Sequence, residues 1–154
     1  MTRVVEGSSQ GSGLHIGVAV ARWNQAITER LLDGALRRLD ALGVDDVTVV
    51  HVPGALELSL ACKKLAEAGC DGVVAIGAVI KGETDHYAIV VGESARGLTI
   101  ASLDTGVPVT NAILAVHDYQ LAVDRAGPGN DNKGVEAVDA AVAMATALEE
   151  LGST

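Results

Sequence analysis

Aromatic side chains are scarce in this sequence, which contains no phenylalanine, two tyrosines and one tryptophan among 154 residues. Proline is also rare, with three residues, whereas 49% of the residues are hydrophobic. A core of valine, leucine, isoleucine and alanine hardly needs rings to fill it. The positions of Trp23, Tyr87 and Tyr119 are therefore informative.

Long hydrophobic runs are missing as well. No uninterrupted apolar run reaches the roughly 20 residues that a bilayer-spanning helix needs, and no basic stretch leads into an apolar segment near residue 1 as in a secretory signal. We therefore expect a soluble, cytoplasmic protein without a membrane partner. The formal net charge of −9 disfavours nucleic acid, so an anionic ligand would need a local cluster of positive groups or backbone amides.

Motifs for metal, redox, nucleotide and hydrolytic chemistry are also absent. Cys62 and Cys70 lie eight positions apart, without the close pairing of a metal knuckle or redox motif, so we expect two buried thiols. The four histidines show no ligand spacing, and no zinc site is expected. No segment matches the phosphate-binding loop of NTPases or a nucleophile elbow, and a receiver domain would need acidic residues where Ala21 and Arg22 stand.

Strand-like and helix-like segments alternate along the chain. Residues 1–13 are rich in glycine and serine and are predicted to be flexible, whereas residues 14–154 are predicted to form one domain. Short apolar runs predict strands at 14–20, 47–52, 72–79 and 107–116. Helical periodicity predicts a helix that is capped by Asn24 and ended by Gly43, and further helices at 55–68, 85–103, 119–125 and 133–151. The alternation predicts an α/β fold, a three-layer α/β/α sandwich with a central, mainly parallel four-stranded sheet.

Ligands of such sheets gather at the carboxyl ends of the strands. That rule nominates the loops 21–24, 53–57, 78–86 and 110–118. All three aromatic residues, together with His86 and His117, lie in these loops or beside them. For Trp23, a half-buried packing role and a stacking role against a planar ligand are equally compatible with composition, and its neighbours favour stacking.

The segment 77–86 carries the strongest chemical signal. Thr84 and Asp85 open a helix whose free N–H groups could hold a phosphate, although ordinary capping by either residue is the favoured explanation without other evidence. His86 in the first turn is suited to proton transfer, although a lone histidine is more often a surface or capping residue. Lys81 fits a solvated lysine better than one that forms a Schiff base.

Three further charged residues are candidate ligand contacts. Glu57 lies in the first turn of a predicted helix, where favourable placement in the helix dipole is the alternative to hydrogen bonding with ligand hydroxyls or amines. Arg125 and Lys133 flank the predicted turn at 127–132 and could clamp an anion, or could be solvated charges.

Six collinear blocks, in order from about residue 14 to 150, resemble the 6,7-dimethyl-8-ribityllumazine synthase family. Each block alone is weak, but the six together are highly specific. They are Arg22-Trp23-Asn24, 52–58 (VPGALEL), 77–87 (GAVIKGETDHY), 107–109 (VPV), 124–127 (DRAG) and 132–134 (NKG).

The resemblance implies a flavodoxin-like fold and a site that binds a ribitylaminopyrimidine. Trp23 would occupy the family's aromatic position, which stacks on the pyrimidine ring. Asn24 and Glu57 would contact the ribityl chain, with backbone around Ala55 and Leu56 assisting them.

The resemblance also places the pyrimidine against backbone groups of Val79 and Ile80 and near the Asn111 region of an adjacent subunit. Asn111 stands where the family often has phenylalanine. Two other departures are Ser59, in place of a common proline, and Ala88, where an acidic residue usually follows the histidine–aromatic pair. None of these departures removes a residue with an assigned chemical role.

For the second substrate, a four-carbon keto-phosphate, the resemblance implies a phosphate pocket. Glu83 and Thr84 would offer amides and a hydroxyl, Arg125 of a neighbouring subunit would complete the pocket, and Lys133 would assist. His86 matches the proton-transfer histidine. The implied chemistry of Schiff-base formation, phosphate elimination, ring closure and loss of water requires no metal and no other cofactor.

The family further implies a homo-oligomer, either a pentamer or a sixty-subunit icosahedral shell of pentamers, in which the N-terminal segment adds a strand to a neighbour's sheet. Riboflavin synthase is a candidate partner. Two rivals remain: a catalytically silent ligand-binding or shell-forming protein of the same fold, and a flavin-binding protein. The second would need a loop rich in serine and threonine where Arg22-Trp23-Asn24 stands.

Overall fold

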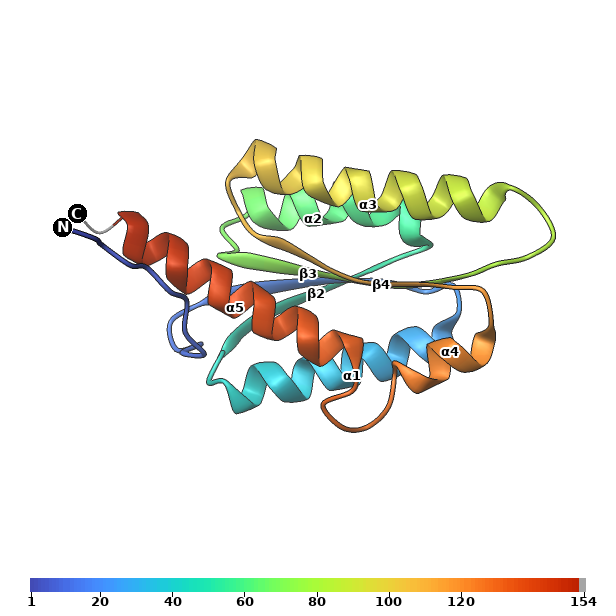
Figure 1. Ribbon diagram of the computed structural model, residues 1–154, viewed down its shortest axis with the longest axis horizontal. Helices are drawn as coiled ribbons and strands as arrows, with labels where there is room; N and C mark the ends of the chain where they lie inside the picture. Colours follow the sequence, from blue (N-terminus) through green and yellow to red (C-terminus); the bar gives the residue numbers. More distant parts are fainter. Residues whose placement is uncertain (153–154) are drawn as a thin grey trace.

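Four parallel strands form the centre of the structure, a computed structural model that describes residues 1–152 (Figure 1). Their spatial order is β2-β1-β3-β4. Every neighbouring pair is parallel, as the alternation of predicted elements required. The strands are β1 (His15–Ala21), β2 (Asp46–Val52), β3 (Gly72–Ile80) and β4 (Val109–Val116).

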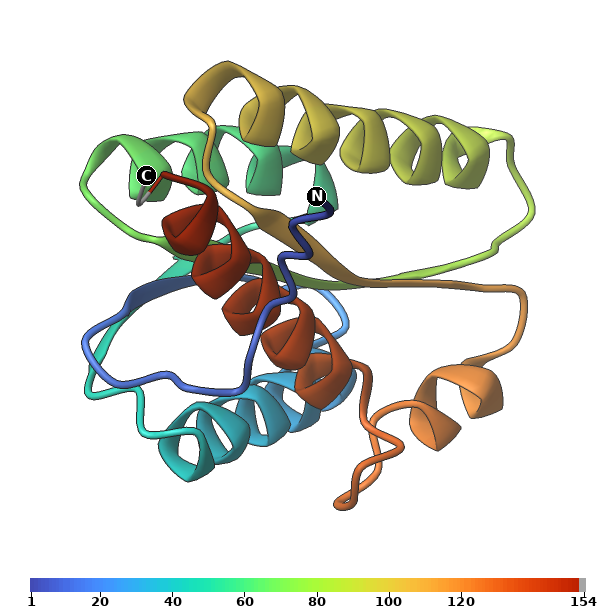
Figure 2. The ribbon, with the colours of Figure 1, turned by 60° about the vertical axis from the view of Figure 1, so that its left-hand side comes forward.

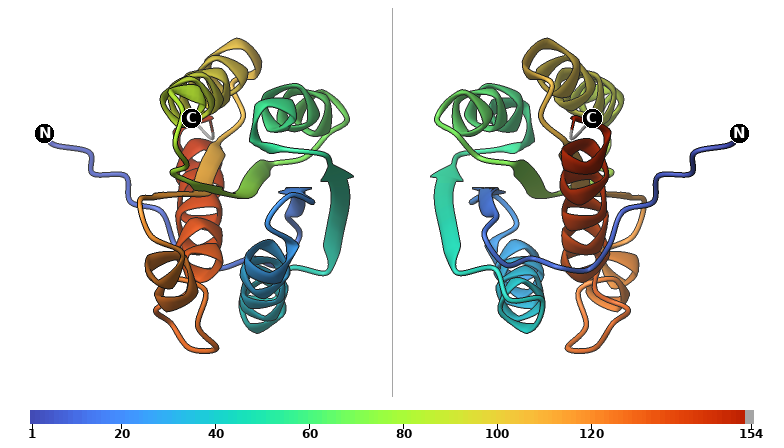
Figure 3. Two further views of the ribbon diagram at one scale, coloured as in Figure 1. Left: turned by 90° about the vertical axis from the view of Figure 1, so that its right-hand side faces the viewer. Right: turned by 90° about the vertical axis from the view of Figure 1, so that its left-hand side faces the viewer.

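Helices cover both faces of this sheet, which confirms the predicted three-layer α/β/α architecture and its flavodoxin-like character (Figures 1 and 3). One layer contains α1 (Gln25–Ala41), α4 (Tyr119–Asp124) and α5 (Lys133–Gly152). The other contains α2 (Leu58–Glu67) and α3 (His86–Thr105), with the short 3-10 helix η1 (Ala55–Glu57) leading into α2.

Successive side chains of the buried strands point to opposite faces of the sheet and pack into two separate hydrophobic cores. Val18 and Val20 of β1 pack toward α1 and α5, whereas Ala19 and Ala21 pack toward α2 and α3. Both predicted buried thiols are confirmed, since Cys62 and Cys70 are free and buried in the second core. Burial raises the pKa of Cys62 to about 12, so this thiol stays protonated and inert near neutrality.

Two predicted element boundaries are wrong for identifiable reasons. The fourth strand begins at Val109 rather than at residue 107, because Pro108 has no N–H to donate to the ladder. Its carbonyl still accepts from the N–H of Val73 at 2.8 Å. The helix predicted over 55–68 is divided into η1 and α2; Gly54 has no side chain with which to cap η1, and the Glu57 side chain does not cap α2.

The predicted capping role of Asn24 is also wrong. Asn24 stands at the N-cap position of α1, but its side chain makes no capping hydrogen bond and its backbone is left-handed, with φ 62°. It is the one non-glycine residue with positive φ among residues 1–152. The side chain is instead directed to β3, where the Nδ2 group donates to the carbonyl of Ala78 at 2.7 Å.

The N-terminal segment runs across α5 (Figure 2). The N–H of Ser8 donates to Thr146 Oγ1 at 2.9 Å, and the Arg3 guanidinium donates to the carbonyl of Glu150 at 2.9 Å. Within residues 1–14 the structure contains no strand. The predicted flexibility of residues 1–13 stays a prediction.

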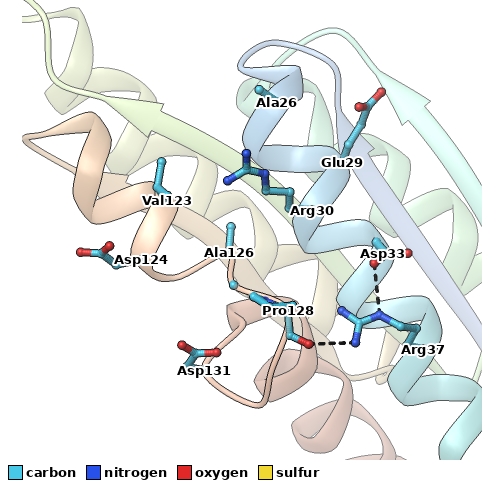
Figure 4. Close-up of a pocket in the computed structure, with 11 residues that line it drawn as sticks. Ala26, Glu29, Arg30, Asp33, Arg37, Val123, Asp124, Ala126, Pro128 and Asp131 are labelled. Atoms are coloured by element: carbon cyan, nitrogen blue, oxygen red, sulfur yellow. Dashed lines mark hydrogen bonds and ion pairs between the residues drawn. The ribbon is translucent and has the colours of Figure 1, made fainter.

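A tight connection between α4 and α5 is held against α1 by two side chains. Asn132 is fully buried; its Nδ2 group donates to the carbonyls of Arg30 at 3.0 Å and Gly127 at 2.9 Å, and its Oδ1 accepts from the N–H of Gly134. Arg37 donates to the carbonyl of Pro128 at 3.0 Å (Figure 4). The connection is thereby fixed near its middle and at its C-terminal end.

We predict that Asn132→Ala lowers the free energy of unfolding by about 2–4 kcal/mol, because it leaves two carbonyls and the start of α5 without partners. Urea unfolding followed by circular dichroism at one protein concentration measures the change. Asn130→Ala, in the exposed part of the same connection, is the matched control and should stay within about 0.5 kcal/mol of the wild type. Equal stability of both variants would contradict the anchoring role of Asn132.

Candidate functional site

A pocket opens where β1 and β3 stop pairing. The ladder between them ends at the pair Val20 and Ile76, but β3 remains paired with β4 as far as Ile80. In the order β2-β1-β3-β4 this gap is the point where the chain changes direction across the sheet, which is where ligands of open α/β sheets bind.

The pocket encloses about 360 Å³. Its walls come from the end of β1, from η1, from the end of β3 and from the first turns of α3. Its lining residues are Ala21, Trp23, Asn24, Ala55, Leu56, Glu57, Ala78, Val79, Ile80, His86 and Val90. Eight of the thirteen predicted site residues therefore meet in one cavity, and we call it the switch-point pocket.

Asn24 bridges the gap between the two strands. Its Nδ2 group donates to the carbonyl of Ala78, which lies beyond the end of the β1–β3 ladder and has no backbone partner on β1. Backbone groups of successive residues in a parallel strand point alternately to its two neighbours, and the N–H of Lys81 points to β4, where it bonds Val116 at 2.9 Å. The N–H and carbonyl of Ile80 therefore face the gap, where a planar ligand can use them.

Trp23 forms an exposed wall of the pocket, with 65% of its surface accessible. Its backbone is tied to the loop before η1, since its N–H donates to the carbonyl of Pro53 at 3.0 Å and the N–H of Arg22 donates to the carbonyl of Val52 at 2.8 Å. A large ring that is exposed at the mouth of a pocket offers a stacking surface.

Glu57 and His86 bring charge and proton-transfer chemistry to the same pocket. Glu57 stands at the N-cap position of α2, yet its side chain makes no capping hydrogen bond. His86 is the first residue of α3 and is exposed. The pocket thus combines one stacking ring, one carboxylate and one imidazole.

The loop before α3 holds the two residues predicted to meet a phosphate. Glu83 and Thr84 are exposed and lie outside the lining of the switch-point pocket. Asp85, a candidate cap in the sequence, makes no capping hydrogen bond, and Thr84 Oγ1 accepts a long bond of 3.4 Å from the N–H of His86. The first N–H groups of α3 are therefore largely available to a ligand.

Arg125 and Lys133 lie in a different hollow of about 800 Å³, lined by residues of β4, α4 and α5. We call it the cationic pocket, although acidic side chains also line it. The N–H of Lys133 donates to the carbonyl of Arg125 at 2.9 Å, and the Lys133 ammonium pairs with Glu136 at 2.9 Å. The structure thus places ten of the thirteen predicted site residues in two separate pockets of the chain.

Asn111 belongs to neither pocket. It is exposed on β4, an edge strand of the sheet, and its Oδ1 accepts from the N–H of Ile113 at 2.7 Å. Between the pockets, the rings of Tyr87 and His117 meet edge to face with centroids 5.6 Å apart. This contact joins the start of α3 to the end of β4.

A third hollow, of about 1040 Å³, lies between α1 and the connection from α4 to α5 (Figure 4). It is larger than either pocket described above, but no aromatic side chain and no histidine lines it. Arg37 of α1 bonds Asp33 on the same helix and the carbonyl of Pro128 on the connection. We place the chemistry at the switch-point pocket because reactive side chains converge there, and size alone does not decide function.

Within residues 1–152, no group of three histidine, cysteine, aspartate or glutamate side chains has the geometry to hold a metal ion. No helix in that part of the chain is long and apolar enough to cross a membrane.

Two features of the site were missed from the sequence. Val90 lines the switch-point pocket one turn after His86, and the helical spacing of four could have revealed it. The apolar lining of the cationic pocket includes Ile113 and Leu121, which had no signal beyond hydrophobicity.

Known proteins are similar in sequence to almost the whole chain. The family described as 6,7-dimethyl-8-ribityllumazine synthase matches residues 13–149. Proteins of that name from Thermococcus kodakarensis and Thermococcus gammatolerans are each 46% identical over 150 residues, covering 97% of this chain and 96% and 97% of theirs. A third, from Thermococcus onnurineus, is 42% identical over 97% of this chain and 98% of its own.

Proposed function

Because the chain belongs to the 6,7-dimethyl-8-ribityllumazine synthase family, we propose that it condenses 5-amino-6-(D-ribitylamino)uracil with 3,4-dihydroxy-2-butanone 4-phosphate. The products are 6,7-dimethyl-8-ribityllumazine, phosphate and water, in the penultimate step of riboflavin biosynthesis. The observation that carries the proposal is the convergence of Trp23, Glu57 and His86 in the switch-point pocket.

Each wall of the pocket suits one part of the pyrimidine substrate. The Trp23 ring would stack on the uracil, whose polar edge would bond the free N–H and carbonyl of Ile80. Val79, whose own backbone groups point to β4, would line the pocket beside it. The Glu57 carboxylate and the Asn24 Oδ1 atom, which accept hydrogen bonds, would bind ribityl hydroxyls, assisted by backbone of Ala55 and Leu56. Asn24 keeps this role even though its Nδ2 group is bound to Ala78.

The reaction begins when the 5-amino group adds to the ketone, and loss of water gives a Schiff base. Elimination then breaks the C–O bond to phosphate, and the ribityl-bearing amine closes the ring with loss of a second water. His86 would move protons in these steps from the rim of the pocket. Holding both substrates in one orientation supplies much of the acceleration, because it turns a bimolecular condensation into an intramolecular one.

The phosphate would bind at the start of α3, where Glu83 and Thr84 offer amides and a hydroxyl. Arg125 and Lys133 are the cations proposed to complete this site, but on this chain they line the cationic pocket instead. We therefore propose that the complete site forms between two copies, with the cationic pocket of one copy facing the switch-point pocket of the next.

Exposed apolar side chains on α3 favour an assembly of copies. Ile89, Ile100 and Leu103 are between 47% and 78% exposed, which is costly for a free surface. We propose a homopentamer in which residues 1–13 add a strand to a neighbour and Asn111 lies at the shared site. A free pentamer and a sixty-subunit shell both satisfy this arrangement. The cytoplasmic location and the partnership with riboflavin synthase stay predictions.

The direct test mixes the purified protein with both substrates and follows lumazine absorbance. We expect product formation in proportion to protein, and His86→Ala should lower kcat by about 10²-fold, the lower end of what a positioned proton donor contributes. His51→Ala, on β2 and outside the switch-point pocket, is the matched control and should retain wild-type kcat. Product formation no faster than the uncatalysed background would favour the silent ligand-binding protein.

Arg125→Ala should raise KM for the keto-phosphate by roughly 10- to 100-fold and leave KM for the pyrimidine nearly unchanged, because it removes one charge-assisted hydrogen bond to phosphate. Steady-state kinetics with each substrate varied in turn measure the difference. Arg30→Ala, at the hollow beside α1, is the charge-matched control. Equal changes in both KM values would count against a phosphate role for Arg125.

A further inference from the structure

Gly54 lies directly against the indole ring of Trp23. A Cβ atom built on Gly54 would collide with Cε3 of the ring and lie 2.6 Å from Cζ3, closer than any real contact of a Cβ atom. The six-membered part of the indole therefore occupies the space that a side chain at position 54 would take. The three nearest atoms to that position all belong to the Trp23 ring.

The backbone of Gly54 does not itself require glycine. Its φ of −140° and ψ of −178° are extended values that any residue adopts. Glycine at this position is therefore explained by the neighbouring ring rather than by the conformation of the chain.

Hydrogen bonds hold the two partners in register. The N–H of Trp23 donates to the carbonyl of Pro53, and the carbonyl of Gly54 accepts from the N–H of Glu57 at 3.2 Å. The same loop thus fixes the start of the Trp23 side chain and lies against its ring, while Trp23 stays 65% exposed and lines the pocket.

We propose that Gly54 is a positioning residue, a flat seat that sets the plane in which Trp23 stacks on the pyrimidine. This inference rests on the proposed function, since it names the device that aligns the stacking ring. An added methyl group displaces the ring, which is free to swing because it is 65% exposed, so the fold tolerates the change while stacking is weakened.

The test uses Gly54→Ala in the assembled, full-length protein. Trp23 is the single tryptophan, so fluorescence reports this ring alone. We expect acrylamide to quench Gly54→Ala more strongly than wild type. We also expect binding of 5-amino-6-(D-ribitylamino)uracil alone to weaken by about tenfold, which corresponds to about 1.4 kcal/mol and lies in the range of base–aromatic stacking.

Two further variants distinguish an effect of Gly54 on the Trp23 ring from a general structural effect. In a Trp23→Ala background, Gly54→Ala should change pyrimidine binding by less than about twofold, because the ring through which it acts is gone. Gly152→Ala is the matched control, since a Cβ atom there meets no other atom within 4 Å. It should match wild type in quenching and in affinity.

Unchanged quenching and affinity in Gly54→Ala would overturn the proposal, and so would a tenfold loss that persists without Trp23. If Gly54→Ala fails to fold, recovery of folding in the double variant with Trp23→Ala supports the positioning role of Gly54. Failure of the double variant to fold overturns it. If wild-type protein binds no pyrimidine, the proposed function fails. The quenching of the unliganded variants then still shows whether Gly54 positions the Trp23 ring.

Discussion

The separation of β1 from β3 beyond Val20 and Ile76 is the constraint on which the rest of the site depends. A sheet that splits in this way leaves backbone N–H and C=O groups without ladder partners, and such groups must find others. Asn24 supplies one through its bond to Ala78, at the cost of a left-handed backbone. The remaining groups, the N–H and carbonyl of Ile80, face a pocket in which a ligand can form hydrogen bonds with them.

The ring, carboxylate and imidazole of the switch-point pocket are placed by the chain segments that leave this split. Trp23 follows β1, Glu57 follows β2 through η1, and His86 begins α3 after β3. The cationic pocket depends instead on the far side of the sheet, where Asn132 anchors the connection that carries Arg125 and Lys133. The presence of two separate pockets on one chain is the basis for the proposal that a complete site needs two copies.

Periodicity predicted the fold well because the central strands β1 and β3 are buried along almost their whole length and read as apolar runs, and because glycines end several helices. It failed where a local preference was overridden. Asn24 has the chemistry of a cap, but the unpaired carbonyl of Ala78 competes for its amide. Pro108 shortened β4 because it lacks an N–H.

The sequence predicted the switch-point pocket more completely than the rest of the site, because residues after successive parallel strands necessarily meet at one edge. It could not show that Arg125 and Lys133 line a separate hollow, since no local pattern records the distance between two loops. The role of Gly54 was equally hidden, because a glycine in a Pro-Gly turn is ordinarily explained by the turn.

The central claim is that each complete site is shared between two copies. Its most direct test mixes His86→Ala and Arg125→Ala subunits, exchanged by unfolding and refolding together, and measures lumazine formation at a keto-phosphate concentration well below the wild-type KM. With random mixing about one quarter of the interfaces pair an intact switch-point pocket with an intact cationic pocket, so activity should rise well above that of either variant alone. Activity no higher than the average of the two separate variants would contradict a site built from two copies.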